Sequence, residues 1–323
     1  MAHKPTKYNF TTVTGFFLYD DANGKPETLP AIAPNFGLKE GQTWSKVVEN
    51  VSRLNRESKD GSLYKLIYSA RHGEGYHNLA EAKYGTEAWD DYWSKLYTDG
   101  EIVWGPDPNL TAVGIGQAQD AHRAWKEQVK KSKEGSDHAP LPSRLYSSPL
   151  TRSADTLRYT WQGILLPESK DQSSSSFTSN GGLLGKLSGI VGELSEDLGR
   201  VGGGHHVQPL IKEGFRETYG EHTCDKRSDR STIHKRFPGY LFEPGFREED
   251  PLWTEERETD QHIVNRVKDA LNQVFVQERK AQVISLTSHS GVMKALFQAT
   301  GHYVVSPKTG ALIPFIVKGT PSN

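Results

Sequence analysis

The stretch that decides the fold is LYKLIYSARHG, residues 63–73, an apolar segment that runs directly into an arginine, a histidine and a glycine. Its aromatic and β-branched residues predict a strand. Two later segments have the same form: one ends in SSPLTR (147–152), and the other, over residues 281–287, ends in SHSG (288–291). Helical segments follow each of them, so strand, loop and helix alternate. This order predicts an α/β protein, a three-layer sandwich with a mainly parallel central sheet flanked by helices.

The spacing of apolar residues accounts for the helices of this alternation. Thr43 and Thr111 are expected N-caps of helices that reach Leu54 and about Lys131, because a threonine hydroxyl can accept a bond from a free N–H of the first turn. Further helices are expected over residues 78–96 with a break near Gly85, 151–161, 255–279 and 291–300. Together these segments supply helices enough to cover both faces of a sheet.

The two ends of the chain depart from the alternation. Residues 1–40 carry scattered aromatic residues among turn residues, which indicates an irregular arm around the body with one short strand at 15–19. Near the other end, the apolar strand over residues 312–316 contains Pro314. A proline cannot donate a hydrogen bond to a sheet, so this strand is expected at an edge.

One internal segment, about 167–210, also interrupts the pattern. It contains a serine run, a modestly apolar middle and a glycine triplet. We expect an insertion that lies over the edge of the sheet where the strands end, acting either as a lid or as a plain linker. Residues 1–323 are expected to form a single domain that includes this insertion and the arm at residues 1–40.

Composition limits the class of protein. The chain has 323 residues, 24% of them charged, and a formal net charge of -1, which argues against disorder and against a nucleic-acid-binding charge excess. Its single cysteine, Cys224, excludes an intrachain disulfide framework and favours a reducing compartment. Residues 1–10 lack the apolar core of a signal peptide, and no stretch approaches the roughly 20 apolar residues of a membrane span. A cytoplasmic protein without membrane or nucleic-acid partners is expected.

The functional prediction comes from the polar residues at the three strand ends. Ligands of parallel sheets bind beyond the carboxyl ends of the strands, so Arg71, His72, Arg152 and His289 are expected to converge. Each arginine can donate a planar pair of N–H groups to phosphate oxygens, and a neutral histidine nitrogen can attack phosphorus. Gly73 would allow the backbone to approach a ligand closely. A single histidine at a strand end is usually structural, but three matching strand ends favour a phosphate site.

Taken in order, these motifs resemble those of the histidine phosphatase superfamily, also called the phosphoglycerate-mutase-like family. RHGEGYHN (71–78) is similar to its Arg-His-Gly signature, with an asparagine six positions after the histidine. SSPLTRSADT (147–156) resembles its second-arginine motif, and SHSG (288–291) its late histidine motif. Residues 71–89 and 217–227 look most like the fungal phosphomutase-like members, which resemble phosphatases more than glycolytic mutases.

The resemblance implies a phosphoglycerate-mutase-like fold and assigns roles to residues. It makes His72 the phosphorylated nucleophile. The residues that would complete the phosphate pocket are Arg71, Arg152 and His289. The proton donor of the family is an acidic residue between the second arginine and the last histidine, for which Glu217 is our choice and Asp225 the competing candidate. The donor must carry a proton in order to assist the leaving alkoxide; the alternative for Glu217 is an exposed glutamate at a helix start.

Four further residues near the motifs are candidates for substrate contacts: Glu74, His77, Asn78 and His222. Asn78 would either bind phosphate and orient His72 or cap a helix, and Glu74 would either contact substrate or begin the next helix. No metal ion or other cofactor is expected. The pair His205 and His206 has no cysteine or carboxylate at ligand spacing, which a zinc site would need.

The leading functional hypothesis is a phosphatase that hydrolyses a phosphomonoester of a small metabolite through a phosphohistidine and releases inorganic phosphate. A phosphomutase would share every catalytic residue, but it must keep water from the phosphohistidine, and residues 75–77 depart from the glycolytic mutase pattern. A non-catalytic protein that binds phosphorylated ligands is the third reading. Such proteins typically lose the nucleophile or an arginine, and this chain keeps both.

Overall fold

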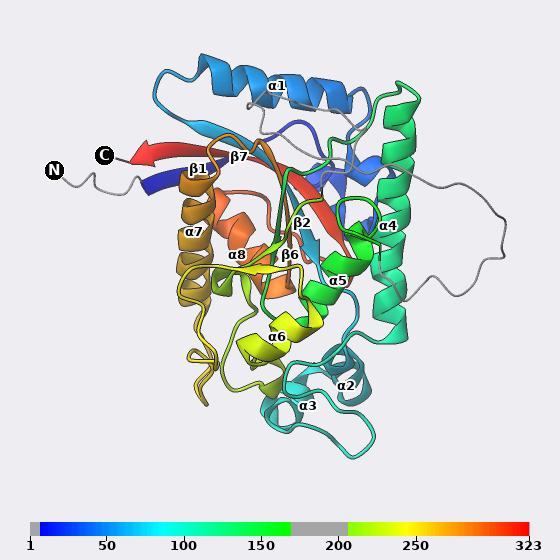
Figure 1. Ribbon diagram of the computed structural model, residues 1–323, viewed down its shortest axis with the longest axis vertical. Helices are drawn as coiled ribbons and strands as arrows, with labels where there is room; N and C mark the ends of the chain where they lie inside the picture. Colours follow the sequence, from blue (N-terminus) through cyan, green and yellow to red (C-terminus); the bar gives the residue numbers. More distant parts are fainter. Residues whose placement is uncertain (1–6, 169–205, 323) are drawn as a thin grey trace, which may run out of the picture.

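The structure is a computed structural model that describes residues 7–168 and 206–322, and its centre is a mixed sheet of seven strands (Figure 1). The spatial order is β1-β7-β2-β6-β3-β4-β5. The strands are β1 (Lys7–Val13), β2 (Leu63–Arg71), β3 (Arg144–Ser147), β4 (Leu210–Ile211), β5 (Leu241–Phe242), β6 (Val283–Ser288) and β7 (Leu312–Ser322). From β2 to β5 all neighbours are parallel, whereas β7 is antiparallel to both β1 and β2. The predicted, mainly parallel central sheet is confirmed.

Helices cover both faces of this sheet, which gives the predicted three layers (Figure 1). They are α1 (Trp44–Glu57), α2 (Tyr76–Tyr84), α3 (Thr86–Asp91), α4 (Ala112–Lys133), α5 (Thr151–Trp161), α6 (Arg230–Arg236), α7 (Asp260–Gln277) and α8 (Ser290–Thr300). On one face, Trp125 of α4 packs against Tyr68 of β2 and Trp161 of α5, with ring centroids 4.9 and 4.7 Å apart. On the other, Phe297 of α8 meets Phe315 of β7 at 5.4 Å. Burial of these aromatic rings joins the layers.

The predicted helix caps are present. The Thr43 hydroxyl accepts the N–H of Lys46 at the start of α1, and the Thr111 hydroxyl accepts the N–H of Gly114 at the start of α4. Gly85 separates α2 from α3 with a φ of 82°, as the expected break requires. The helix predicted from residue 255 begins later, at Asp260, because the Thr259 side chain caps it.

The short strand predicted at residues 15–19 is wrong. Strand β1 lies earlier, at Lys7–Val13, and buries alternate side chains against the sheet. Residues 15–17 instead form a tight turn, because one carboxylate oxygen of Asp20 accepts the N–H groups of Gly15, Phe16 and Phe17. Phe17 still forms an isolated antiparallel bridge with Leu38, but the turn leaves no room for a longer strand.

The position predicted for the strand with Pro314 is also wrong. This strand, β7, is not at an edge but lies between β1 and β2. Pro314 is paired with Tyr68 of β2, whereas β1 ends at Val13, opposite Ile316. The neighbouring Leu312 directs its N–H away from β2, to the carbonyl of Ala31. Pro314 is two residues further along β7 and has the same orientation as Leu312. Its nitrogen, which carries no hydrogen, therefore faces away from β2, toward a side where β1 has already ended.

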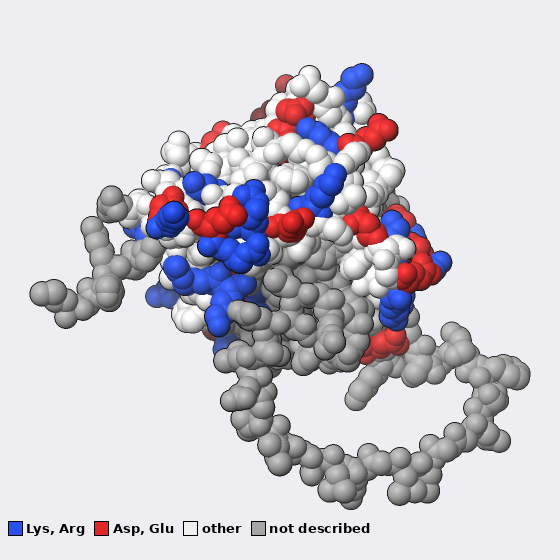
Figure 2. Space-filling model, turned by 90° about the horizontal axis from the view of Figure 1, so that it is seen from above, with Lys and Arg blue, Asp and Glu red and all other residues white. Residues whose placement is uncertain are grey.

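The predicted insertion over residues 167–210 falls largely on 169–205, outside the described residues. Its described end returns to the sheet as β4, which pairs with β3. Among residues 7–168 and 206–322, no helix is both long enough and apolar enough to cross a bilayer. Both basic and acidic side chains lie on the face that carries α1, with Lys and Arg grouped at one side of it (Figure 2).

Candidate active site

The three strand ends meet at one edge of the sheet, as the parallel order requires. In the register of β2 and β6, Arg71 lies beside Ser288, and the His72 N–H donates to the Ser288 carbonyl at 2.9 Å. The next residues along the two strands, His72 and His289, therefore face each other with ring centroids 5.0 Å apart. Arg152 lies in the first turn of α5, directly beyond β3, and is fully buried. The structure thus brings together the residues that the three motifs contribute.

The imidazole of His72 is held in one tautomer. Its Nδ1 lies 2.6 Å from the carbonyl oxygen of Gly73. A carbonyl can only accept, so Nδ1 carries the hydrogen and Nε2 keeps its lone pair. Burial, followed by the charges of Arg152 and Arg71, holds the pKa of His72 well below its usual range. The ring is therefore neutral near pH 7, which is the state that a nucleophile needs.

Two more neutral imidazoles lie beside His72. His289 places Nε2 2.7 Å from the hydroxyl oxygen of Ser148, and His77 places its ring centroid 5.4 Å from that of His72. Burial, followed by the charge of Arg152, lowers the pKa of both histidines well below the usual range. Of these two, the sequence motifs made His289 part of the pocket and His77 a secondary candidate.

Several polar atoms of this pocket are buried without a protein partner. They are Nε of Arg71, Nε of Arg152, Nδ1 of His77 and Nδ1 of His289, which have no hydrogen-bond partner among the described residues. Buried polar groups are nearly always hydrogen-bonded in folded proteins. Both arginine atoms are donors, and a neutral imidazole nitrogen can be one. Their concentration here fits a ligand that offers several acceptor oxygens, such as a tetrahedral oxyanion. We call these residues, with His72, the phosphate pocket.

Glu217 lies beside this pocket and against the start of α8. Its carboxylate accepts the N–H of Thr218 at 3.0 Å and that of Gly291 at 3.3 Å. A Cβ atom on Gly291 would lie 2.2 Å from Oε1 of Glu217, so only glycine leaves room for the carboxylate. Gly291 is two residues beyond His289. The late histidine motif therefore positions both a histidine and the predicted proton donor.

Asp225, the competing proton donor, is already occupied. Its Oδ1 accepts Nη2 of Arg152 at 2.7 Å and its Oδ2 accepts Nη1 of Arg257 at 2.9 Å. Burial would raise the pKa of Asp225, but the charges of Arg257 and Arg152 outweigh it and lower the pKa. An ionised carboxylate with both oxygens engaged has no proton to give. This geometry makes Asp225 unsuited to donate a proton.

The remaining candidates, Asn78, Glu74 and His222, make contacts outside the phosphate pocket. The Asn78 side-chain oxygen accepts the Gly75 N–H at 3.1 Å, at the start of α2, and the Glu74 carboxylate accepts the Thr111 hydroxyl at 2.6 Å. Asn78 thus has the helix-capping contact of its structural alternative, whereas Glu74 does not begin α2, which starts at Tyr76, but contacts the cap of α4. His222 is half-buried, packs edge-on against Trp89 and lies 3.8 Å from the carboxylate of Asp90. Its ring is outside the set of unpartnered donors described above.

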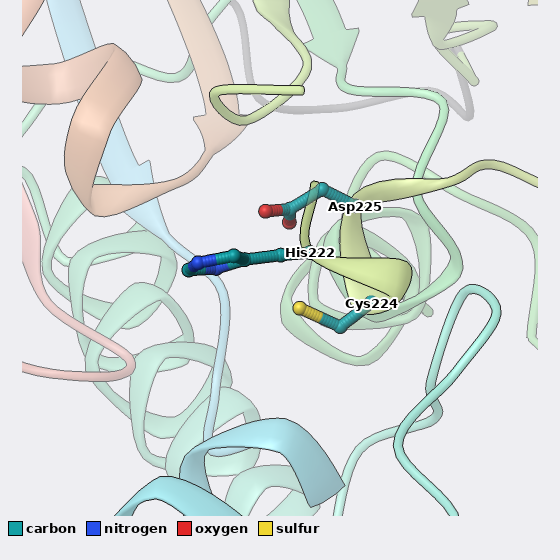
Figure 3. Close-up of side chains that lie close together, drawn as sticks. All are labelled: His222, Cys224 and Asp225. Carbon is teal, nitrogen blue, oxygen red and sulfur yellow. The ribbon is translucent and has the colours of Figure 1, made fainter. Parts of the chain in front are cut away.

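One group of side chains has the composition of a metal site. His222, Cys224 and Asp225 hold ligand-type atoms within 4.8 Å of one another (Figure 3). However, both oxygens of Asp225 accept from guanidinium groups, and burial raises the pKa of the Cys224 thiol well above its usual range. Metal ligation needs a free carboxylate and a thiolate. The group is therefore better suited to anchor Arg152 than to bind a cation. His205 of the histidine pair lies outside the described residues.

Sequence motifs did not identify Arg257. It lies in the polar segment before α7, and nothing in its sequence neighbourhood connects it with Arg152. Only the fold brings it to Asp225. The role of Asp225 as an anchor was likewise not apparent, because an acidic residue near a catalytic motif suggests acid–base chemistry first.

Three fungal proteins are similar to the chain over most of its length. The chain is 34% identical to a probable phosphoglycerate mutase of Arthroderma benhamiae, with 96% of the chain and 84% of the relative covered. It is 30% identical to phosphomutase-like protein 3 of Candida albicans, with 88% and 72% covered. Identity to a probable phosphoglycerate mutase of Saccharomyces cerevisiae is also 30%, with 86% and 85% covered. No family model matches the chain.

Solved structures give a weaker likeness. An α-ribazole phosphatase from Shigella flexneri aligns over 76% of this chain and 88% of its own, with 14% identity and a TM-score of 0.40. A phosphoglycerate mutase from Bacillus anthracis aligns over 75% and 82%, with 12% identity and a TM-score of 0.37. These scores are too low to carry an argument, so the assignment rests on the fungal relatives.

Proposed function

Because the chain belongs to the histidine phosphatase superfamily, we propose that it is a phosphoric monoester hydrolase that acts on a small phosphorylated metabolite through a phosphohistidine at His72. The observation that carries the proposal is the set of unpartnered donors around this imidazole. One unpartnered nitrogen on each of two guanidinium groups and two imidazoles suits the oxygens of a phosphate group. Neutral His72, with its lone pair on Nε2, stands among them as the nucleophile.

In the first step, Nε2 of His72 would attack phosphorus while the bond from phosphorus to the ester oxygen breaks. Arg71, Arg152 and His289 would donate to the three non-bridging oxygens, whose charge redistributes in the transition state. Glu217, entering the step protonated, would give its proton to the departing alkoxide. The products of this step are an alcohol and phosphohistidine, with Glu217 as a carboxylate.

In the second step, the carboxylate of Glu217 would take a proton from a water molecule whose oxygen attacks phosphorus. The bond between nitrogen and phosphorus breaks, the electron pair returns to Nε2, and inorganic phosphate leaves. Both His72 and Glu217 are then in their starting states. We propose that no metal ion takes part, since Arg71 and Arg152 can meet the phosphate charge. A cytoplasmic site of action is proposed on the basis of the single cysteine, Cys224.

The proposal predicts a covalent intermediate that depends on His72. Brief reaction with a radiolabelled phosphate ester, followed by quenching in alkali, should leave acid-labile label on the wild-type protein and none on His72→Ala. Turnover by His72→Ala should fall at least about 1000-fold, as expected when a nucleophile is removed. His234→Ala is the matched control, because His234 is an exposed histidine on α6.

Two outcomes would contradict the proposal in different ways. Wild-type turnover by His72→Ala would rule out the nucleophile. Transfer of phosphate between the hydroxyl groups of a phosphoglycerate, without release of inorganic phosphate, would identify a mutase, the activity in the names of two of the fungal relatives. The mutase shares the pocket, so product analysis rather than mutation separates the two reactions.

A further inference from the structure

A buried carboxylate joins the phosphate pocket to a third arginine. Asp225 accepts Nη2 of Arg152 at 2.7 Å through one oxygen and Nη1 of Arg257 at 2.9 Å through the other. The side chains of Arg152 and Asp225 are only 1% and 4% exposed, whereas that of Arg257 is 30% exposed. Arg257 therefore lies nearer the surface than Arg152, and it is connected to the phosphate pocket through Asp225.

The charges of these three residues give a reason for the contact between Arg257 and Asp225. A buried carboxylate paired with Arg152 alone would offset much of the positive charge that a phosphate group needs, since both interactions occur in a medium of low dielectric constant. With Arg257 on its second oxygen, Asp225 is shared between two cations. The three groups then carry a net positive charge, and Arg152 can remain anchored without losing its attraction for an anion.

We propose that Arg257 is a positioning residue for catalysis: through Asp225 it orients the Arg152 guanidinium and keeps its positive charge available to the phosphate group. This inference rests on the proposed phosphatase function. Arg152 uses Nη1 for the Cys224 carbonyl at 2.8 Å and Nη2 for Asp225, and its buried Nε has no partner among the described residues. The two anchors engage both Nη atoms and leave Nε as the unpartnered donor.

The turn that carries Asp225 is also held independently of Arg257. This turn, Thr223–Asp225, has its last carbonyl bound by Nη2 of Arg216 at 2.7 Å. Arg216 is itself paired with both carboxylate oxygens of Asp250, at 2.8 and 2.7 Å. A change at Arg257 should therefore alter the second oxygen of Asp225 without releasing the turn. This makes the charge effect measurable in a folded protein.

The test is the binding of inorganic phosphate, measured by titration calorimetry, because this probe has no organic group that Arg257 could contact. Arg257→Met should weaken phosphate binding about tenfold, in the range of couplings between contacting groups. Arg257→Lys should recover most of the affinity. Arg257→Gln, which can still donate to Asp225 but has no charge, should behave like Arg257→Met if charge is the main effect.

A double-mutant cycle separates this mechanism from general destabilisation. In the Asp225→Asn background there is no carboxylate to offset, so adding Arg257→Met should change phosphate affinity less than threefold, well below its effect in the wild type. Arg236→Met is the matched control. Arg236 and Arg158 share the buried carboxylate of Asp155 in the same manner. Arg236 is not paired with Asp225, so its loss should leave phosphate affinity unchanged.

The outcomes distinguish this inference from the proposed function. Failure of the wild-type protein to bind phosphate would overturn the phosphate pocket and the inference together. Wild-type affinity in both Arg257→Met and Arg257→Gln would overturn the inference alone, and so would effects of Asp225→Asn and Arg257→Met that simply add. If a substitution lowers the melting temperature, binding is compared at a temperature where circular dichroism shows both proteins folded.

Discussion

At the scale of single residues, backbone atoms beside the proposed catalytic side chains limit how those side chains can act. The Gly73 carbonyl fixes the tautomer of His72, and the Gly291 N–H donates to the carboxylate of Glu217. In Arg-His-Gly the glycine contacts the histidine of the same motif, whereas the glycine of Ser-His-Ser-Gly contacts Glu217, which lies outside the motif. The convergence of the motif residues could be predicted from the sequence, but the contact between Glu217 and Gly291 could not, because 74 positions separate them.

Gly291→Ala should impair the proton donor and spare phosphate binding. The new Cβ would lie 2.2 Å from Oε1 of Glu217, so the carboxylate must move away from the leaving group. We expect kcat to fall about 100-fold, the lower end of what a general acid contributes. Affinity for inorganic phosphate should be unchanged. Gly239→Ala is the control, because a Cβ at this exposed glycine meets open space. An unchanged kcat in Gly291→Ala would argue against Glu217 as the donor.

At the scale of elements, the predictable parts are those with a repeating pattern. Apolar spacing and threonine caps predict most of the helices, and apolar runs that end in motifs predict three of the strands, but the short helix α6 was not predicted. Strands β4 and β5 have two residues each, too few to show any alternation. The turn at residues 15–17 depends on the Asp20 carboxylate, a contact that strand propensity does not describe. Arg257 was missed because its partner is distant in sequence.

The loop that follows β2 interlocks with the first turn of α4. The Glu74 carbonyl accepts the Thr111 N–H at 2.9 Å. A Cβ on Gly73 would lie 2.2 Å from the Gly114 carbonyl oxygen, and a Cβ on Gly114 would lie 2.0 Å from that of Glu74. The two backbones therefore approach as closely as glycine permits. This contact holds the segment that carries His72.

Gly114→Ala should therefore destabilise the protein and disturb its active site together. We expect a loss of about 1–3 kcal/mol in the free energy of unfolding, the usual cost of overpacking, measured by urea denaturation. Phosphatase activity should also fall. Gly116→Ala, two residues along the same helix, meets open space and should be neutral or stabilising by up to about 1 kcal/mol, through helix propensity. Equal effects of the two substitutions would contradict the interlock.

At the scale of the whole molecule, the pocket reduces stability in acid. Three histidines, His72, His77 and His289, have pKa values held well below the usual 6.5, first by burial and then by nearby charge. Neutral rings favour nucleophilic attack, but the folded protein resists the protonation that the unfolded chain accepts freely. The arrangement that suits phosphate chemistry therefore limits the range of pH in which the fold is most stable.

The free energy of unfolding should decline as pH falls below 6.5. Each unfolded-state pKa, near 6.5, lies above the folded-state value, so in acid the unfolded chain binds protons that the folded one does not. Each histidine then removes up to about 1.4 kcal/mol per pH unit. Asp250, whose pKa is lowered to about 2 from 3.8, loses its contribution only at lower pH. Urea denaturation between pH 7 and 5 therefore reports the histidines.

A substitution can identify the source of this slope. His77→Gln should lower the slope of the unfolding free energy against pH by the contribution of about one bound proton. His234→Gln, at an exposed position on α6, should not lower the slope by this amount. A pH dependence in His77→Gln as steep as that of the wild type would show that His77 is protonated in the folded state.

The place of β7 between β1 and β2 has a consequence for biosynthesis. Strand β1 has β7 as its sheet partner, yet almost the entire described chain separates the two. While a ribosome is still making the protein, the emerging β1 has no strand to join and β2 has an open flank on that side. Closure of the sheet is therefore a late event that waits for residues 312–322, and a prematurely terminated chain would expose the very surfaces from which aggregates grow.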